Sequence, residues 1–373
     1  MTAVLSPTAP APWPAPAPPA TARRMAIVPG LLACAAVAAV ATVAGRLVPV
    51  IGAPVFGIVL GVAVGQIPRT PALDLRLRPG IGFSSRTVLQ WSIVLLGTGL
   101  SLTGIAHTGL SSLPVLLGTL ALALAMAWGA GRLLGIGGDL RTLIGVGTGI
   151  CGASAIAATT AVIGAAEADV AYAISTIFAF NVIAVLTYPA LGHVLGLSQH
   201  AFGLWAGTAI NDTSSVIAAA YTYGHAAGDY GVVVKLTRTL MIIPISLVLA
   251  VRTRRRVAGR GVSGAAASGV GAAEIAAPAA RPRIRLAQLV PWFLVGFLLA
   301  AGVNTAGLVP QAAHAWLSAV SLFFITMALS GIGLSTRPLE LRRAGLRPLA
   351  LGAILWATVG ISSLAIQALL GLH

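Results

Sequence analysis

The stretch Gly145-Val146-Gly147-Thr148-Gly149-Ile150-Cys151-Gly152-Ala153-Ser154 lies inside an apolar segment and yet disfavours a helix. Four glycines fall within eight residues, and each weakens a helix by roughly 1 kcal/mol relative to alanine. A second apolar segment contains Gly207-Thr208-Ala209-Ile210-Asn211-Asp212-Thr213-Ser214-Ser215. Its Asn, Asp, Thr and Ser residues favour caps and turns over helix interiors. Both segments therefore predict helices that are interrupted near their middle.

The rest of the chain indicates a membrane protein. Of its 373 residues, 57% are hydrophobic and 8% are charged, whereas a soluble domain carries about a quarter charged residues. A β-barrel would show short alternating segments, but the apolar stretches here are long enough to cross a bilayer as helices. We expect an all-α polytopic membrane protein with about eleven transmembrane helices. The expected spans are 26–45, 50–66, 83–101, 111–131, 142–164, 170–192, 200–221, 230–251, 287–308, 312–334 and 349–370.

The positive charges give this threading an orientation. Of the 23 Lys and Arg residues, 20 fall in loops or at span ends on one side, and only Arg46 falls on the other. Because positive loops stay in the cytoplasm, we expect the N-terminus inside and the C-terminus outside a bacterial plasma membrane. Nucleic-acid binding would instead require basic residues clustered on a soluble face. The net charge of +15 is therefore interpreted as a topology signal, with membrane lipid and no nucleic acid as partner.

Composition also divides the chain. Residues 1–25 are rich in Pro and Ala and predict a disordered cytoplasmic tail. Residues 26–251 hold the first eight spans, 252–286 form an Arg/Gly/Ala-rich cytoplasmic linker, and 287–373 hold the last three. Arg23-Arg24 before an apolar run also fits an export signal, but ten further spans favour an uncleaved first helix. Small-residue faces would permit a homodimer.

Short internal matches predict a repeat. Phe56-Gly57-Ile58-Val59-Leu60-Gly61 resembles Phe202-Gly203-Leu204-Trp205-Ala206-Gly207, and Thr148-Gly149-Ile150-Cys151-Gly152 resembles Ser330-Gly331-Ile332-Gly333. Each match joins a span to the one five places later. Since an odd shift reverses orientation, the halves are expected to be inverted five-helix repeats with broken helices, as in many secondary transporters.

Ionisable residues inside spans mark the candidate site. Asp212, Lys235 and Arg238 are the ionisable residues buried in spans, and counting 1.5 Å per residue places Asp212 and Arg238 at nearly equal depth. Such groups are costly in a membrane and usually functional. A structural Asp212–Arg238 pair is the alternative, but it leaves one cation over. For the glycines of the first interrupted span, close helix packing is an equally good explanation.

Several motifs resemble one family. Gly149-Ile150-Cys151-Gly152-Ala153-Ser154-Ala155-Ile156-Ala157-Ala158, Phe202–Gly207 and Lys235-Leu236-Thr237-Arg238 look like signatures of the bacterial family named as sulfate exporters, the otherwise uncharacterised YeiH-type inner-membrane proteins. The resemblance covers about residues 28–372. It implies a fold similar to the cation/proton antiporter and bile-acid symporter group. Many members carry a His-Glu pair where this chain has Asn211-Asp212, which puts substrate and coupling in question.

We therefore expect a secondary transporter that exports a small anion, sulfate-like or an organic sulfonate or carboxylate, by alternating access. Lys235 and Arg238 would attract the anion, and Asp212 would bind a coupling proton or sodium ion or orient Arg238. The alternative is a cation/proton antiporter that uses Asp212 as its carrier. An enzyme is disfavoured because the spans hold no metal-ligand set and no activated Ser-His pair, and no cofactor is expected. The residues expected to bind substrate are Gly147, Thr148, Gly149, Cys151, Gly152, Ser154, Asn211, Thr213, Ser214, Ser215, Lys235 and Arg238.

Overall fold

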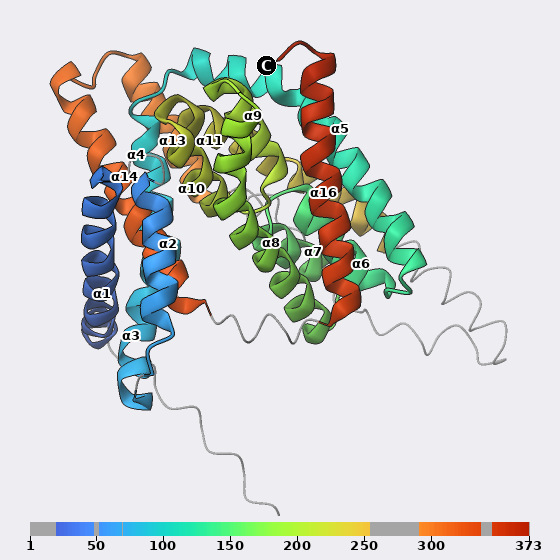
Figure 1. The fold of residues 1–373 in the computed structure, drawn as a ribbon, viewed down its shortest axis with the longest axis horizontal. Helices are drawn as coiled ribbons and strands as arrows, with labels where there is room; N and C mark the ends of the chain where they lie inside the picture. Colours follow the sequence, from blue (N-terminus) through green and yellow to red (C-terminus); the bar gives the residue numbers. More distant parts are fainter. Residues whose placement is uncertain (1–19, 48–51, 69, 254–290, 337–344, 373) are drawn as a thin grey trace, which may run out of the picture.

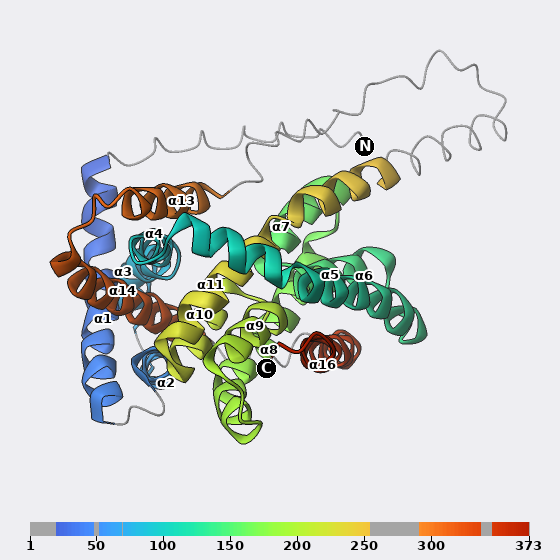
Figure 2. The same cartoon turned by 90° about the horizontal axis from the view of Figure 1, so that it is seen from above.

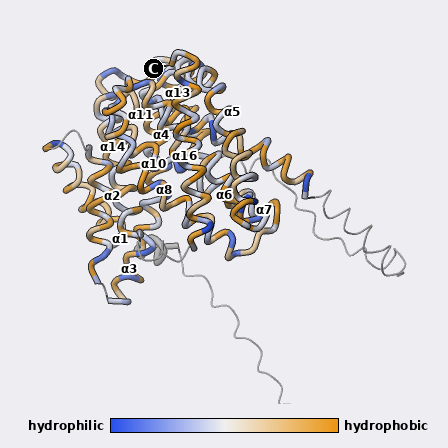
Figure 3. Tube along the Cα trace, turned by 45° about the vertical axis from the view of Figure 1, so that its right-hand side comes forward, coloured by the Kyte–Doolittle hydropathy of each residue, from blue (hydrophilic) through white to orange (hydrophobic). Residues whose placement is uncertain are grey.

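The computed structural model describes residues 20–47, 52–68, 70–253, 291–336 and 345–372. These residues form helices joined by short connections and include no strand. Six of the helices are long and apolar enough to span a membrane, and hydrophobic residues predominate along the helices (Figure 3). The all-α expectation is confirmed for this part of the chain. Most of the predicted tail and linker, residues 1–19 and 254–286, lies outside the described residues.

The helices on one side of the molecule form what we call the first bundle, the blue and orange part of Figure 1. Its elements are α1 (Ala20–Leu47), α2 (Gly52–Gly65), α3 (Pro71–Phe83), the π-helical turn η1 (Ser84–Val88), α4 (Leu89–Gly97), α13 (Trp292–Thr305) and α14 (Gln311–Ser335). Helices α2 and α14 pack closely because glycines face the contact. A Cβ atom at Gly61 would lie 2.6 Å from the Ser330 carbonyl oxygen.

The second bundle comprises the remaining helices. Its elements are α5 (Leu102–Leu133), α6 (Gly138–Gly149), α7 (Ala153–Ile163), α8 (Glu167–Val194), α9 (Gln199–Ala209), α10 (Thr213–Tyr223), α11 (His225–Thr239), a helical continuation of α11 over 242–253, and α16 (Leu346–Leu369). Seen from above, α10 and α11 lie between the first bundle and the rest of the second (Figure 2). The turn at 98–101 connects the two bundles between α4 and α5.

Helices α6 and α7 form a hairpin. A continuous helix would separate Gly147 from Ile156 by about 13 Å, but a Cβ at Gly147 would lie 3.0 Å from the Ile156 side chain. Ile163 at the end of α7 packs against the core cluster that contains Ile136, which precedes α6. The chain reverses at Gly152, whose φ of 70° and ψ of −130° require a glycine. Both ends of this hairpin therefore lie on one side of the molecule.

Helices α9 and α10 form a second hairpin. The Tyr223 hydroxyl, at the end of α10, donates a hydrogen bond to the Leu197 carbonyl just before α9 begins. The Tyr223 ring also stacks on Phe202, with centroids 3.9 Å apart. The chain bends through Ile210 and Asp212, which both have extended backbone conformations. The ends of this hairpin also share one side.

The two hairpins enter from opposite sides. Helix α8 has 28 residues and is about 42 Å long, and it runs from the end of the first hairpin to the start of the second. The tips meet in the middle, where a Cβ at Gly152 would lie 3.6 Å from the Asp212 Cα. The segments 142–164 and 200–221, which were expected to be interrupted crossings, each turn back at the interruption, and the expected total of eleven crossings is not confirmed.

The sequence matches that predicted inverted repeats do not pair equivalent elements. The matched segments of α2 and α14 lie in continuous helices, whereas their partners lie in the interrupted segments α9–α10 and α6–α7. The hairpin tips themselves show a correspondence at a spacing of 60 residues. Thr148-Gly149-Ile150-Cys151-Gly152-Ala153-Ser154 aligns with Thr208-Ala209-Ile210-Asn211-Asp212-Thr213-Ser214, and both segments turn at the third to fifth of these positions.

Candidate functional site

Lys235 of α11 joins the two hairpin tips. The last carbonyls of α6 and α9 have no partner within their own helices, as at any helix C-terminus. The Lys235 Nζ atom donates to the Ile150 carbonyl at 2.9 Å and to the Ile210 carbonyl at 2.8 Å. Its side chain is completely buried. These two isoleucines occupy corresponding positions in the two tips.

Arg238, one turn further along α11, repeats this arrangement. Its Nε donates to the Gly149 carbonyl at 2.7 Å and its Nη2 to the Thr148 carbonyl at 3.2 Å, both at the end of α6. Its Nη1 donates to the Thr208 carbonyl at the end of α9. Arg238 is also completely buried. Because a helix C-terminus carries a partial negative charge, the two bases are attracted to both helix ends and hold the tips together.

Asp212 caps α10 and does not pair with Arg238. Its Oδ2 accepts hydrogen bonds from the Ser214 amide at 3.1 Å, from the Ser215 amide at 3.3 Å and from the Ser214 hydroxyl. No Asp212–Arg238 ion pair occurs among the described residues. The sequence-based alternative in which Asp212 orients Arg238 is not seen here: the guanidinium is bonded to backbone carbonyls, which a sequence does not reveal.

Two buried polar atoms at the tips lack a hydrogen-bond partner. The Oδ1 atom of Asn211 and the Oγ1 atom of Thr148 make no hydrogen bond within the described residues, although each residue is only 1% exposed. Buried polar groups are normally paired, and an orphan requires an explanation such as a bound ligand, ion or water. Both atoms lie in the segments that the sequence predicted to form the site.

Some residues at the tips are accessible. Ser154 in the first turn of α7 is exposed, and Asp212 and Thr213 at the start of α10 are half-buried. The other residues predicted to bind substrate are buried around them: Gly147, Thr148, Gly149, Cys151, Gly152, Asn211, Ser214, Ser215, Lys235 and Arg238. The structure thus brings the predicted set together at two tips and one face of α11.

Sequence reasoning missed Asn181 of α8. Its side-chain Oδ1 accepts a hydrogen bond from the Asp212 amide at 3.2 Å, and the residue is 4% exposed. The sequence did contain a signal for this residue. Its side-chain amide lies inside the apolar span 170–192, and a polar residue at that depth needs a partner.

The charges at the tips leave a positive surplus. Each helix end carries about half an elementary charge, so the C-termini of α6 and α9 cancel the N-termini of α7 and α10. Lys235, Arg238 and Asp212 then leave a surplus of roughly one positive charge at the tips. Within the described ranges, no group of three or more His, Cys, Asp or Glu residues could hold a metal ion.

Comparison with known proteins identifies relatives but no substrate. The family model "Conserved hypothetical protein 698" matches residues 29–352. A UPF0324 membrane protein of Streptococcus pyogenes serotype M6 is 41% identical over 356 residues, which cover 92% of this chain and 97% of that protein. Another, from Fusobacterium nucleatum, is 38% identical over 363 residues, covering 92% and 98%. No solved structure matches. The resemblance noted in the sequence is confirmed as common membership of one bacterial family: the chain belongs to the conserved hypothetical protein 698 family, the UPF0324 membrane proteins.

Proposed function

We propose that this protein is a secondary transporter that binds a small anion between the two hairpin tips and exports it by alternating access. The observation that carries the proposal is the meeting of two opposed hairpins at a buried, polar and positively charged point. In a membrane, non-helical backbone is tolerated where it is buried in protein or lines a wet cavity. The same positions are where transporters with inverted repeats bind substrates.

The anion would lie beside the accessible residues of the tips, Ser154, Asp212 and Thr213. The first backbone N–H groups of α7 have no partner within their own helix, so they form a site for negative charge. The Ser154 hydroxyl lies in the same turn. Asn211 and Thr148 supply the unpaired polar atoms. Lys235 and Arg238 contribute mainly through their field, since two of the three lysine N–H groups and three of the five arginine N–H groups already bind carbonyls. A sulfate-like or small sulfonate or carboxylate anion fits this chemistry.

The proposed topology has nine crossings. In this arrangement neither hairpin crosses the membrane. The crossing segments are α1, α2, α3 to α4, α5, α8, α11 with its continuation, α13, α14 and α16. The loops that change sides, 164–166 and 195–198, contain no Lys or Arg. The excess of positive charge on one side is therefore unchanged, and the N-terminus stays inside and the C-terminus outside. The tips, corresponding at a spacing of 60 residues and entering from opposite sides, support an inverted repeat centred on the hairpins.

The proposal is tested with purified protein in a thermal-shift series. Sulfate, small sulfonates and carboxylates are compared with chloride at equal ionic strength. A ligand that binds only the folded state at 100 times its Kd adds about 2.7 kcal/mol to stability. We expect such a shift for one of these anions and its loss in Ser154→Asp, which places a negative charge at the α7 terminus. The matched control is Ser101→Asp. Ser101 caps the start of α5, which is distant from the tips, and the substitution keeps that cap. An absence of any shift, or a full shift in Ser154→Asp, would contradict the proposal.

A cation/proton antiporter is the second candidate. It is favoured by Asp212, which is half-buried and accepts all three hydrogen bonds on one oxygen, so that its Oδ1 is available for a proton or sodium ion. Flux of labelled sulfate and of sodium into inside-out vesicles separates the two functions. Sodium movement without sulfate movement would favour the antiporter.

A further inference from the structure

The contact between the two bundles is largely apolar. Helix α10 packs against α2 and α14, and side chains from all three helices share one core cluster. The cluster includes Ile217 and Ala218 of α10, Val55 and Ile58 of α2, and Ile325 and Leu329 of α14. Hydrophobic contact is non-directional, so this seam fixes the relative position of the bundles less strictly than polar contacts would.

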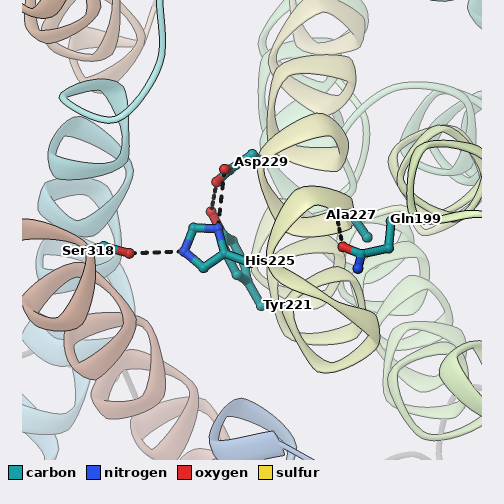
Figure 4. Close-up of polar contacts among 6 residues, drawn as sticks. All are labelled: Gln199, Tyr221, His225, Ala227, Asp229 and Ser318. Atoms are coloured by element: carbon teal, nitrogen blue, oxygen red, sulfur yellow. Dashed lines mark hydrogen bonds and ion pairs between the residues drawn. The ribbon is translucent and has the colours of Figure 1, made fainter. Parts of the chain in front are cut away.

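One polar contact crosses the seam at its outer end. His225, at the start of α11, has its Nε2 2.9 Å from the Ser318 hydroxyl of α14 (Figure 4). On its other side, the His225 Nδ1 lies 3.3 Å from an Asp229 carboxylate oxygen, and the Tyr221 hydroxyl donates to the second oxygen of Asp229. The remaining side-chain hydrogen bonds that join the bundles within the described residues lie at the 98–101 turn, where the chain already connects them.

A cavity lies beside this contact. It has a volume of about 340 Å³ and is lined by Ser101 and Ile105 near the connecting turn, by His200 of α9, and by Asp229 and Tyr230 of α11. The outer part of α11 is therefore not closely packed against the turn at 98–101. Lys235 and Arg238 bond α11 to the hairpin tips of its own bundle, so α11 moves with that bundle. With free space beside the turn and a single polar contact to α14, the second bundle can shift at low cost, as in the shear movement of packed helices.

We propose that the His225–Ser318 contact is a latch that holds α10 and α11 against the first bundle at the outer face. Its opening releases the second bundle to shift along the apolar seam. The latch holds in either protonation state of His225, because the Ser318 hydroxyl accepts a hydrogen bond as readily as it donates one. The inference rests on the proposed transport function only for the role that this movement plays. The test below measures movement without a substrate, so a failure of the latch and a failure of anion binding are distinguishable.

The test is hydrogen–deuterium exchange of the purified full chain. Exchange reports the population of locally open states, and the loss of one ordinary hydrogen bond corresponds to a change of about 2- to 12-fold in that population. Ser318→Ala should speed exchange in 213–235 by this factor and leave α2 unchanged. Ser318→Thr keeps the hydroxyl and should restore the wild-type rate. Ser335→Ala is the matched control, since the Ser335 hydroxyl bonds only to the Gly331 carbonyl of its own helix.

A second variant tests the closed state. His225→Cys combined with Ser318→Cys, bridged by a short bifunctional thiol reagent, should slow exchange in 213–235 below the wild-type rate, whereas neither single variant should do so. The native cysteines, Cys34 and Cys151, are buried. The latch is refuted if Ser318→Ala behaves like Ser335→Ala, if exchange rises equally throughout α2 and α10, or if the bridged protein exchanges like the unbridged one.

Discussion

Arg238 acts on the structure through backbone atoms. Sequence alone identified Asp212, Lys235 and Arg238 as the ionisable residues inside spans, because charge in an apolar segment is conspicuous. It could not identify their hydrogen-bond partners. These partners are backbone carbonyls, which every residue has, so no residue type marks them in the sequence. The alternative of a structural Asp212–Arg238 pair is not seen for this reason: five carbonyls from the two tips accept the hydrogen bonds of the two bases.

Arg238→Ala should destabilise the protein as well as abolish anion binding. The substitution leaves three buried carbonyls without partners, and each orphaned acceptor costs about 1–3 kcal/mol. We expect a loss of roughly 3 kcal/mol or more, seen as a lower unfolding midpoint in detergent. Arg238→Lys keeps the charge but cannot reach both tips with a planar fork, so it should fall between wild type and alanine. Arg132→Ala, at an exposed position, is the control. An unchanged midpoint in Arg238→Ala would disprove the bridging role.

Asp212→Asn separates capping from coupling. Asn and Asp are nearly equivalent N-caps, so the unfolding midpoint should change little, whereas Asp212→Ala should lose about 1 kcal/mol. If Asp212 carries the coupling ion, the asparagine variant keeps anion binding and loses gradient-driven flux. Wild-type flux in Asp212→Asn would show that the carboxylate serves only as a cap.

At the scale of elements, the interruptions were predictable and the reversals were not. Glycines at 145–152 and the polar run at 211–215 correctly placed the two breaks. Hydropathy cannot distinguish a broken crossing from a hairpin of the same length. The length of each helix within the interrupted segments was a signal that the sequence reasoning did not use. Helices α6 and α7 have 12 and 11 residues and are therefore about 18 and 16 Å long. Each is about half as long as the hydrocarbon core is thick.

Close packing of α2 on α14 gives a prediction at this scale. Gly61→Ala would place a methyl group 2.6 Å from the Ser330 carbonyl, so the first bundle must separate locally, and overpacking typically costs about 1–3 kcal/mol. Gly129→Ala in α5 meets nothing within 4 Å and should be neutral or stabilising by up to about 1 kcal/mol. Unfolding midpoints of the two variants check this, and equal midpoints would contradict the packing argument.

For the whole molecule, the charge pattern predicts an orientation in the membrane but not the number of crossings. If two crossings are replaced by two hairpins, the number of crossings stays odd and no Lys or Arg changes sides of the membrane. The positive-inside rule therefore cannot separate eleven crossings from nine, and only the contacts within each hairpin do so.

Cysteine labelling distinguishes these two topologies. In the hairpin arrangement, Ala168 lies inside and Leu195 outside, whereas eleven crossings place them the other way round. Both positions are exposed. We expect an impermeant thiol reagent added to intact cells to label Leu195→Cys and not Ala168→Cys, with permeabilised cells labelling both. The reverse pattern would restore the two crossings.

The bridging of both tips by α11 has a consequence for biosynthesis. Lys235 follows the Ile150 carbonyl by 85 residues, and at about 5–20 residues per second the ribosome needs roughly 4–17 s to make that interval. Until then the tip of the first hairpin has carbonyls that neither lipid nor its own arms can satisfy. The newly made 138–163 segment should therefore wait at the aqueous surface and enter the bilayer only after α11 emerges. A nascent chain arrested before residue 235 should remain open to protease at that segment, and one arrested after α11 has left the ribosome should be protected.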